Sequence, residues 1–454
     1  MKISLPTTSP LCHTDFTFGV ATAAFQIEGA AEGRLECIWD KFCATPDKIK
    51  DGSDAIVACD HFNLWQNDID LITSLKVDAY RFSISWARVI KLDGSLNPQG
   101  VDFYIQLLDT LETKKIKAYV TLYHWDLPQH LEDKGGWLNR ATAYHFRDYV
   151  ALITQALGQR VYSYATLNEP FCSAYLGYEV GTHAPGLASK NFGKKAAHHL
   201  LLAHGLAMQV LSENSPTTQN GIVLNISPYC GKTDSDEDKA AAYLADQHFN
   251  QWYLMPLLKG CYPNIIDTLP DSEKPDVFKG DMQIIAQKLD YLGINYYTRE
   301  VVRADEEEGF TKEQDKVLPL TDMGWEIYPQ GLSEVLVELD KRYNLPPVLI
   351  TENGAAMPDI YANGQVNDLD RVEYIQRHLE AVHNAVNQGV DVQGYFAWSL
   401  MDNFEWAEGY AKRFGIVHVD YATQKRTIKQ SGVAFRDFID ARHSGIRLTK
   451  HPNV

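Results

Sequence analysis

Two glutamates lie at the ends of apolar runs, each beside polar residues that a buried strand would not otherwise tolerate. Glu169 belongs to the segment TLNEP, and Glu352 belongs to the segment ITENG much further along the chain. In such a pair one carboxyl group can protonate a leaving oxygen while the other attacks carbon or activates a water, which is the chemistry of glycoside hydrolysis. A structural ion-pair role is the alternative for any two glutamates, and the amide and aromatic residues around both of them disfavour it.

Other apolar runs end in the same way. A polar residue at a single strand end often only caps the next helix, but repeated endings from distant parts of the chain predict one convergent pocket. Carboxylates, amides, an imidazole and indoles suit a neutral polyhydroxyl ligand, because polar groups hold hydroxyls while an indole covers the apolar face of a sugar. No glycine-rich loop accompanies them to hold a phosphate. The further candidates are Gln26, Arg81, His124, Asn168, Asn295, Tyr297, Trp398, Glu405 and Trp406.

The elements that must position these residues are eight β-rich runs alternating with segments of helical periodicity. Such alternation predicts parallel βαβ units, and eight units can close into a (β/α)8 TIM barrel whose chemistry lies at the C-terminal ends of the strands. An open doubly wound sheet is the alternative, disfavoured because Gly19 and Gly29 do not form a GxGxxG loop. The runs are Phe16–Gln26, Ala79–Trp86, Lys117–His124, Tyr162–Asn168, Gly221–Ser227, Tyr291–Tyr297, Val348–Glu352 and Val392–Trp398. The helical segments are His61–Leu75, Phe103–Thr113, Ala141–Leu157, Lys194–Ser212, Leu332–Lys341 and Leu369–Gln388.

Domain organisation follows from the spread of these features. A chain of 454 residues allows three domains of about 150 residues, but one barrel with insertions can exceed roughly 400 residues. The candidate residues extend from Gln26 to Trp406, so we expect a single barrel domain over residues 1–454. The polar stretches Asp234–Lys239 and Ala304–Asp315 are predicted to be solvated loops, too short to serve as linkers.

Charge and cysteine usage restrict the partners and the compartment. The chain has 42 Lys plus Arg and 59 Asp plus Glu, a formal charge of −17, which argues against a nucleic-acid partner. No apolar stretch is long enough for a membrane span, and no apolar run follows the N-terminus as in a secretory signal. Seven scattered cysteines without a CxxC pair favour a reducing cytoplasm. We expect no cofactor and no metal site, and His198, His199 and His204 are interpreted as structural histidines.

The chain resembles glycoside hydrolase family 1, the β-glucosidase family, from about Phe16 to Ser431. The segments that carry the resemblance are FGVATAAFQIEGA, RFSISW, LYHWDLPQ, TLNEP, GINYYT, ITENG and GYFAWSLMDNFEWAEGY, in the family's order. The resemblance implies a (β/α)8 barrel and a retaining β-glycosidase acting on terminal non-reducing β-D-glucosyl residues of cellobiose, short oligosaccharides or aryl and alkyl glucosides. It also implies that Glu169 is the general acid/base and Glu352 the nucleophile.

Further roles follow from the same resemblance. Arg81, Asn295 and Tyr297 match residues that surround and orient the nucleophile, and Trp325 matches a position on the aglycone side. Trp398 is expected to stack beneath the sugar. The residues that match positions holding its hydroxyls are Gln26, His124, Asn168, Glu405 and Trp406.

The mechanism implied is retention, with the two carboxyl groups about 5–5.5 Å apart. At that distance the charge of Glu352 should raise the pKa of Glu169 and keep it protonated. Glu169 is not the glutamine of the thioglucosidase branch, so O-glycosides are expected, and an intact Glu405 argues against the 6-phospho-β-glycosidase branch.

Several alternatives stay open at this point. A mainly transglycosylating enzyme would share the covalent intermediate. A sugar-binding barrel without activity and a NAD-dependent oxidoreductase are disfavoured by the two glutamates and the missing glycine motif. The same polar residues can serve glucose, galactose or fucose, and the chain could be a monomer or a homo-oligomer.

Overall fold

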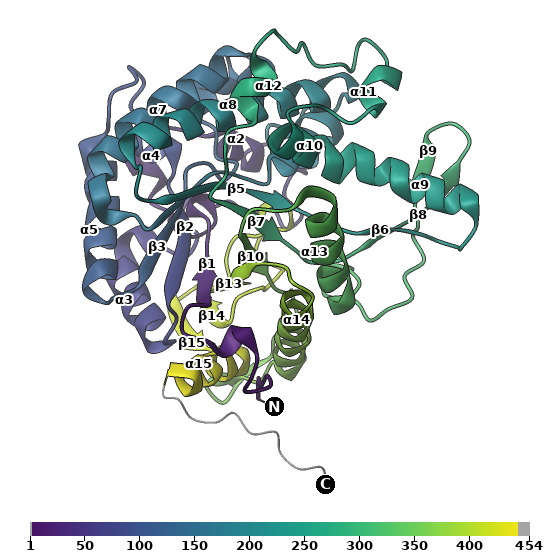
Figure 1. The fold of residues 1–454 in the computed structure, drawn as a ribbon. Helices are drawn as coiled ribbons and strands as arrows, with labels where there is room; N and C mark the ends of the chain where they lie inside the picture. Colours follow the sequence, from purple (N-terminus) through teal and green to yellow (C-terminus); the bar gives the residue numbers. More distant parts are fainter. Residues whose placement is uncertain (1, 444–454) are drawn as a thin grey trace.

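Eight parallel strands form a closed barrel in the computed structural model, which describes residues 2–443. Going round the barrel, the strands follow the order β1-β13-β10-β7-β5-β4-β3-β2 (Figure 1). Each of the eight predicted runs overlaps one of them, so the predicted barrel is confirmed. The strands are β1 Thr17–Ala21, β2 Ala79–Ser83, β3 Lys117–Thr121, β4 Ser163–Asn168, β5 Gln219–Asn225, β7 Tyr291–Asn295, β10 Val348–Asn353 and β13 Val392–Trp398.

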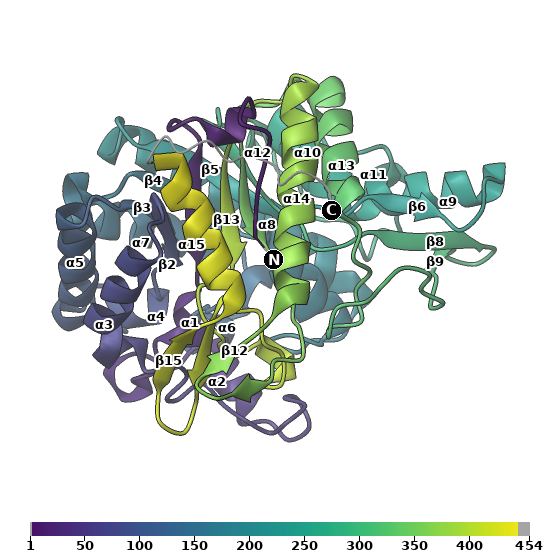
Figure 2. The same cartoon turned by 90° about the horizontal axis from the view of Figure 1, so that it is seen from below.

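Helices surround the barrel on its outside (Figures 1 and 2). All six predicted helical segments are present, and α7 has the predicted bounds, Ala141–Leu157. No helix within residues 2–443 is both long enough and apolar enough to cross a bilayer. The other large helices are α3 His61–Ser74, α5 Pro98–Thr113, α8 Lys190–Asn214, α13 Pro329–Tyr343, α14 Leu369–Asn387 and α15 Gln430–His443. The shorter ones are α1 Ala24–Ile27, α2 Ile38–Cys43, α4 Trp86–Val89, α6 Gln129–Glu132, α9 Asp236–Asp246, α10 Trp252–Lys259, α11 Ile265–Thr268 and α12 Asp281–Ile285.

Several predicted strands are too long at their C-terminal ends. The sheet pairing of β1 stops at Ala21, and Gln26 lies in the short helix α1. In the same way β3 ends before His124 and β7 ends before Tyr297. The apolar pattern continues past each strand because the floor of the pocket buries these residues, whereas the backbone has already left the sheet. Gln26, His124 and Tyr297 therefore lie in the connections that follow their strands.

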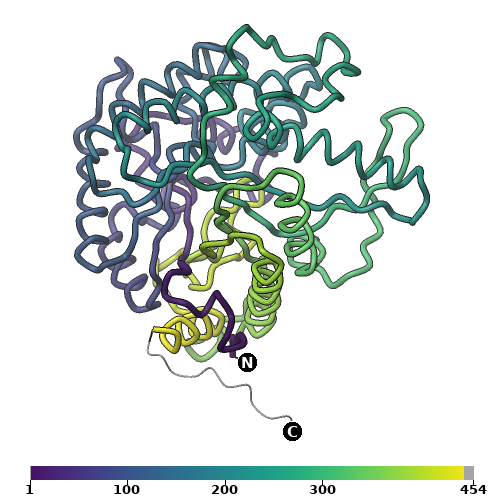
Figure 3. Tube along the Cα trace, viewed as in Figure 1, coloured from purple at the N-terminus to yellow at the C-terminus, as the bar shows by residue number. Residues whose placement is uncertain are grey.

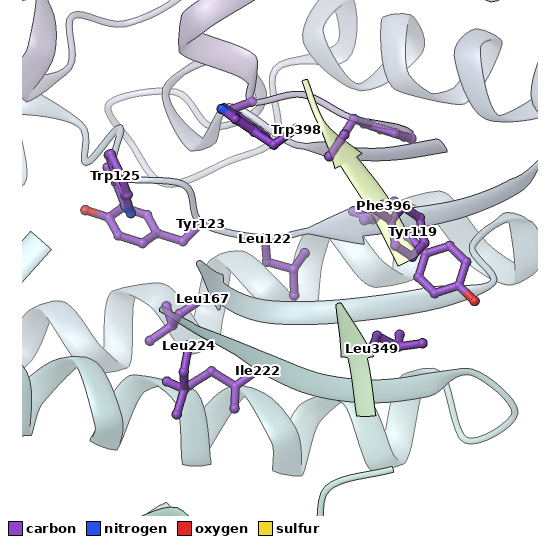
Figure 4. Close-up of a cluster of buried hydrophobic side chains, with 14 of the residues drawn as sticks. Tyr119, Leu122, Tyr123, Trp125, Leu167, Ile222, Leu224, Leu349, Phe396 and Trp398 are labelled. Atoms are coloured by element: carbon purple, nitrogen blue, oxygen red, sulfur yellow. The ribbon is translucent and has the colours of Figure 1, made fainter. Parts of the chain in front are cut away.

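The first and last strands close the barrel by pairing with each other. Thr17–Ala21 of β1 pair in parallel with Gly394–Trp398 of β13, and the N-terminal segment lies beside α14 and α15 (Figure 3). Figure 4 shows Phe396 and Trp398 on β13, two residues apart and therefore on the same face of the strand. The ring of Phe396 packs against Tyr119 of β3, 4.9 Å away, so the interior is filled by side chains and the pocket lies above it.

The prediction that both polar stretches are loops was wrong in part, because residues of each belong to a helix or a strand. Asp236 begins α9, whose N-terminal Ser235 accepts a hydrogen bond from the backbone of Asp238, and acidic residues in a first turn complement the helix dipole. The second stretch includes the end of β8 Glu300–Asp305 and all of β9 Gly309–Lys312, and this hairpin joins β6 Tyr229–Gly231. Figures 1 and 2 show α9 and this small sheet projecting from the barrel. We call this unit the arm.

A buried ion cluster holds the segment that follows β13. The amino group of Lys429 lies 2.6 Å from Asp402 and also pairs with Asp359. The Arg371 guanidinium binds Asp359 at 3.0 Å, and Arg413 binds Asp402 at 2.7 Å. Lys429, Asp402, Asp359 and Arg371 are almost fully inaccessible to solvent. The cluster therefore ties the chain between β13 and the pocket to α14 and to the hairpin of β14 Val417–Asp420 and β15 Lys425–Ile428.

We predict that Lys429→Met lowers the free energy of unfolding by about 3–5 kcal/mol, because it leaves two buried carboxylates without their shared cation. Chemical denaturation measures the change. Lys425→Met removes an exposed lysine from the same hairpin and should change stability by less than about 0.5 kcal/mol. Equal effects of the two substitutions would contradict this role of the cluster.

Candidate active site

Glu169 and Glu352 line one cavity of about 330 Å³ at the C-terminal ends of the barrel strands. Glu352 lies near the end of β10, and Glu169 directly follows β4 with a left-handed backbone angle φ of 45°. Two strands, β5 and β7, separate β4 from β10 in the barrel, so the glutamates approach from strands three positions apart rather than from directly opposite ones. The strained backbone at Glu169 is of the kind that surrounding structure maintains at functional sites.

Two donors hold the carboxylate of Glu352. Arg81 of β2 donates from Nη1 to Oε1 at 2.5 Å, and the hydroxyl of Tyr297 donates to Oε2 at 2.7 Å. Burial and the charge of Glu352 raise the pKa of Tyr297 well above its usual value, so the phenol stays protonated and acts as a donor. Both oxygens are thereby oriented by charge-assisted hydrogen bonds.

The surroundings of Glu169 are different. The amide of Asn295 donates to Oε1 at 2.6 Å, and the thiol of Cys172 donates to Oε2 at 3.1 Å. Burial, followed by the nearby charge of Glu352, raises the pKa of Glu169 to about 7. No cation pairs with this carboxyl group among the described residues. Glu169 can therefore hold a proton near neutral pH.

A network of amides joins the two carboxyl groups. Asn168 accepts hydrogen bonds from Arg81 Nη2 at 2.6 Å and from Asn295 Nδ2 at 3.1 Å. Its own amide nitrogen lies 3.1 Å from His124 Nε2, and burial holds the pKa of His124 well below its usual value. A neutral ring that accepts at Nε2 carries its proton on Nδ1. That nitrogen has no partner within residues 2–443.

Gln26 and Glu405 form a second polar group in the pocket. The Gln26 amide donates to the Phe404 carbonyl at 2.8 Å and to Asn403 Oδ1 at 3.0 Å, while its own oxygen has no partner within residues 2–443. Burial, followed by the charge of Glu352, raises the pKa of Glu405 to about 8. A protonated Glu405 can donate as well as accept. Together with His124, these residues offer unused polar atoms to a ligand rich in hydroxyls.

Tryptophans cover the apolar sides of the pocket. The ring of His124 lies at an interplanar angle of 20° to Trp398, 6.0 Å away, and to Trp406, 5.9 Å away. Trp325 packs against Tyr297 at 5.5 Å. Of the twelve predicted site residues, the three that do not line the cavity, Gln26, Arg81 and Asn168, contact residues that do. The nine that line it are His124, Glu169, Asn295, Tyr297, Trp325, Glu352, Trp398, Glu405 and Trp406.

The sequence profile described as glycosyl hydrolase family 1 matches residues 10–444. The chain belongs to this family. It is 43% identical to β-glucosidase A of Thermotoga maritima, over 93% of this chain and 96% of the relative. It is 44% identical to a β-glucosidase of Agrobacterium, over 92% and 93%. A solved structure of a family 1 β-glucosidase from T. maritima with isofagomine lactam matches at a TM-score of 0.91 and 41% identity, over 97% of this chain and all of the other.

The protein is thus a glycoside hydrolase of the retaining, β-glucosidase type that these relatives represent. Its barrel and its strand-end residues agree with the fold that the sequence resemblance implied. The contacts of the two glutamates differ from each other in this chain. Glu352 is paired with a cation, whereas Glu169 is paired with neutral donors.

Several residues of this glycoside hydrolase that line the cavity were missed in the sequence. Cys172 lines the cavity and donates its thiol hydrogen to Glu169. Trp125 donates from its indole to the Asn168 carbonyl at 2.9 Å and lines the cavity. Proximity to Glu169 and His124 in the sequence could have indicated both. Phe249 and Tyr229 come from the connection between β5 and β7, where no motif indicates them.

The three histidines of α8 are structural, as predicted. His198 lies between the Tyr262 hydroxyl at 2.8 Å and Asp281 at 2.9 Å. His204 contacts the Thr166 hydroxyl at 2.7 Å, and His199 contacts a backbone carbonyl at 2.8 Å. Within residues 2–443 no three His, Cys, Asp or Glu side chains are grouped so as to hold a metal ion.

We predict that Arg81→Met destabilises the enzyme by about 3–5 kcal/mol, because the buried carboxylate of Glu352 loses its cation. In a Glu352→Gln background the same substitution should cost clearly less, because no uncompensated charge remains. Urea denaturation of the wild type, both single variants and the double variant measures this coupling. Additive losses would show that the pair is not coupled in the folded state.

Proposed function

We propose that this enzyme is a β-glucosidase in which Glu169 is the general acid/base and Glu352 the nucleophile. The observation that carries the proposal is the contrast between two carboxyl groups in one cavity. Glu352 is oriented by Arg81 and Tyr297, while burial and the charge of Glu352 raise the pKa of Glu169 to about 7. A proton donor beside an oriented carboxylate is what a retaining mechanism requires.

The first half of the proposed reaction forms a bond to Glu352. Its carboxylate attacks the anomeric carbon from one face, while Glu169 gives its proton to the glycosidic oxygen and the aglycone leaves as an alcohol. The product is a covalent glycosyl ester with inverted configuration at that carbon. Because Tyr297 and Arg81 keep the carboxylate in place, little reorganisation is needed as the bond forms.

The second half releases the sugar. Esterification removes the negative charge of Glu352, so the main charged neighbour that raises the pKa of Glu169 disappears and Glu169 can act as a base. It takes a proton from water, whose oxygen attacks the anomeric carbon, breaks its bond to Glu352, releases that carboxylate and restores the β configuration. A sugar hydroxyl in place of water would give transglycosylation, the runner-up activity, through the same intermediate.

The substrates proposed are O-linked β-D-glucosides with the glucose at the non-reducing end. The relatives named β-glucosidase support glucose as the sugar. Unpartnered atoms of Gln26 and His124, together with Glu405, support a ligand rich in hydroxyls. Cellobiose, short oligosaccharides and aryl or alkyl glucosides all present such a sugar.

A 6-phosphorylated sugar is the less favoured substrate. Glu405 lies in the pocket, where its carboxyl group supplies no positive charge to a phosphate. Lys412, which could have supplied a positive charge, pairs with Asp322 at 3.3 Å and does not line the cavity. The Tyr410 hydroxyl donates to the Asp54 carbonyl at 2.8 Å. These side chains are therefore engaged away from the sugar.

We also propose that residues 1–454 act as one catalytic domain in the cytoplasm. The family profile extends over residues 10–444, which supports a single unit. All seven cysteines are free thiols, which suits a reducing compartment. Fractionation of the source cells with an antibody against the protein tests the location.

We predict that Glu352→Gln abolishes turnover of 4-nitrophenyl β-D-glucoside, because the amide cannot form the ester. Glu169→Ala should keep slow turnover of this substrate, whose leaving group needs little protonation. Azide should accelerate that variant and yield β-glucosyl azide, as judged by NMR. An α-azide, or undiminished activity of Glu352→Gln, would contradict the assigned roles, and release of the α-anomer by the wild type would contradict retention.

We predict that kcat/KM of the wild type falls on the alkaline side of about pH 7, because Glu169 must carry its proton in the free enzyme and its pKa is raised to about 7. Initial rates measured between about pH 4 and 10 give the pH dependence of kcat/KM. Glu169→Ala should lose this alkaline limb. Glu405→Gln should keep it, which separates Glu169 from the other carboxyl group of raised pKa. Loss of the alkaline limb in Glu405→Gln but not in Glu169→Ala would show that Glu405, not Glu169, is the group that must carry the proton.

A further inference from the structure

Glu405 and Trp406 begin a short turn that folds back on itself. The backbone nitrogen of Glu405 donates to the Gly409 carbonyl at 2.7 Å, and that of Gly409 donates to the Trp406 carbonyl at 3.1 Å. Trp406 has a left-handed backbone angle φ of 50°, which a bulky residue keeps only where the surrounding structure maintains it. We call residues 405–410 the turn. Its conformation determines where the carboxyl group of Glu405 lies in the cavity.

The indole of Trp406 is held in place by other rings. Its ring centre lies 4.6 Å from that of Trp39 and 4.6 Å from that of Trp125, and Phe25 stacks on it at 6.0 Å. The Trp406 side chain is almost completely buried among them. These contacts fix the indole itself, whereas the backbone at the end of the turn is held by other partners.

Those partners come from a loop near the start of the chain. Residues 45–57 connect α2 to α3 without a helix or strand, and we call them the supporting loop. The backbone nitrogen of Lys50 donates to the Ala407 carbonyl at 2.9 Å. The hydroxyl of Tyr410 donates to the Asp54 carbonyl at 2.8 Å. The supporting loop thus contacts the turn at two points through its own backbone.

Asp51 adds a contact that depends on a side chain. Its Oδ2 accepts a hydrogen bond from the backbone nitrogen of Tyr410 at 2.8 Å, and its Oδ1 accepts one from the backbone nitrogen of Ser53 at 3.0 Å. Gly409 has a φ of 63°, and the carboxylate of Asp51 occupies the space that a side chain at this position would need. One carboxylate therefore joins the supporting loop to the end of the turn, through hydrogen bonds of the stronger, charge-assisted kind.

We propose that Asp51 is a positioning residue for sugar binding, because its hold on the Tyr410 backbone sets the position of Glu405 across the turn. This inference rests on the proposed β-glucosidase function, in which Glu405 binds hydroxyls of the sugar. The two ends of the turn are joined directly, since Glu405 donates to Gly409, the residue before Tyr410. A shift of the Tyr410 backbone is therefore transmitted to Glu405, and small displacements of a binding group weaken its contacts.

Affinity for deoxynojirimycin, an iminosugar with the hydroxyls of glucose, tests the inference without depending on turnover. We expect Asp51→Ala to bind it about fivefold more weakly than the wild type in calorimetric titration, the effect of losing one hydrogen bond. Asp51→Asn should stay within about twofold of the wild type, because its amide oxygen can still accept from Tyr410.

Asp54→Ala is the matched control. It removes a second exposed carboxylate from the supporting loop, one that accepts from the backbone of Ile56 and makes no hydrogen bond to the turn within residues 2–443. The carbonyl of residue 54 that Tyr410 binds is kept. This variant should change the affinity for deoxynojirimycin by less than about twofold.

Two further measurements separate positioning from a general loss of stability. Hydrogen exchange, followed by mass spectrometry, should become about fivefold faster in a peptide that covers the turn of Asp51→Ala and stay unchanged in a peptide from α7. For 4-nitrophenyl β-D-glucoside, Asp51→Ala should lower kcat/KM about fivefold in the wild type and less than about twofold in Glu405→Ala. The second effect is smaller because the residue through which Asp51 acts is then absent.

The outcomes separate the inference from the function on which it rests. Unchanged affinity for deoxynojirimycin in Asp51→Ala, an equal loss in Asp54→Ala, or an undiminished loss of kcat/KM in the Glu405→Ala background would overturn the inference. Faster exchange throughout the chain would also overturn it, because Asp51 would then only stabilise the fold. Failure of the wild type to hydrolyse any β-glucoside would overturn the proposed function, and titration and exchange would still decide whether Asp51 holds the turn for ligand binding.

Discussion

The active site depends on one buried cation, the guanidinium of Arg81. A charge removed from water must be matched by partners, because an unpaired buried ion is strongly destabilising. Arg81 on β2 meets this requirement with Glu352 of β10 and Asn168 of β4. These contacts bring side chains from three strands of the barrel together above its filled interior, and they hold the carboxylate of Glu352 in one orientation.

Asn168 extends that constraint to the other half of the site. Its carbonyl oxygen accepts from both Arg81 and Asn295, and Asn295 in turn donates to Glu169. The cation is therefore linked to Glu169 only through neutral amides. This arrangement leaves burial and the charge of Glu352 as the leading influences on Glu169, and both raise its pKa. Two chemically identical side chains thereby have different partners within one small cavity.

The rest of the cavity presents two kinds of surface to a ligand. Gln26, His124 and Glu405 leave polar atoms or exchangeable protons available to a ligand. Elsewhere in the lining, Asn250 and Thr298 are already hydrogen-bonded to the protein, and aromatic rings form much of the remaining surface. A polar group that is already paired gains little from a ligand, whereas an apolar ring gains from any flat partner. The groups that the fold leaves unpaired are therefore those available to a ligand in this cavity.

The sequence by itself determined the number of barrel strands and most of the site. Alternation of apolar runs and helical periodicity reports which faces are buried, and in a parallel barrel all strand ends meet at one edge. That is why residues as distant as Gln26 and Trp406 could be assigned to one pocket before their positions were known. The ends of the strands were less accurate, because the pocket floor buries residues just as a sheet does.

Only the tertiary structure decided the electrostatics of the active site and the aromatic residues that reach the cavity from the connection between β5 and β7. The protonation of Glu169 depends on its burial and its closeness to Glu352, and the spacing of two residues along the chain contains neither quantity. Phe249 and Tyr229 come from a long connection whose path over the barrel mouth is set by packing of the arm. Local patterns report local burial, whereas charges and rings act through space on whatever the folded chain brings near them.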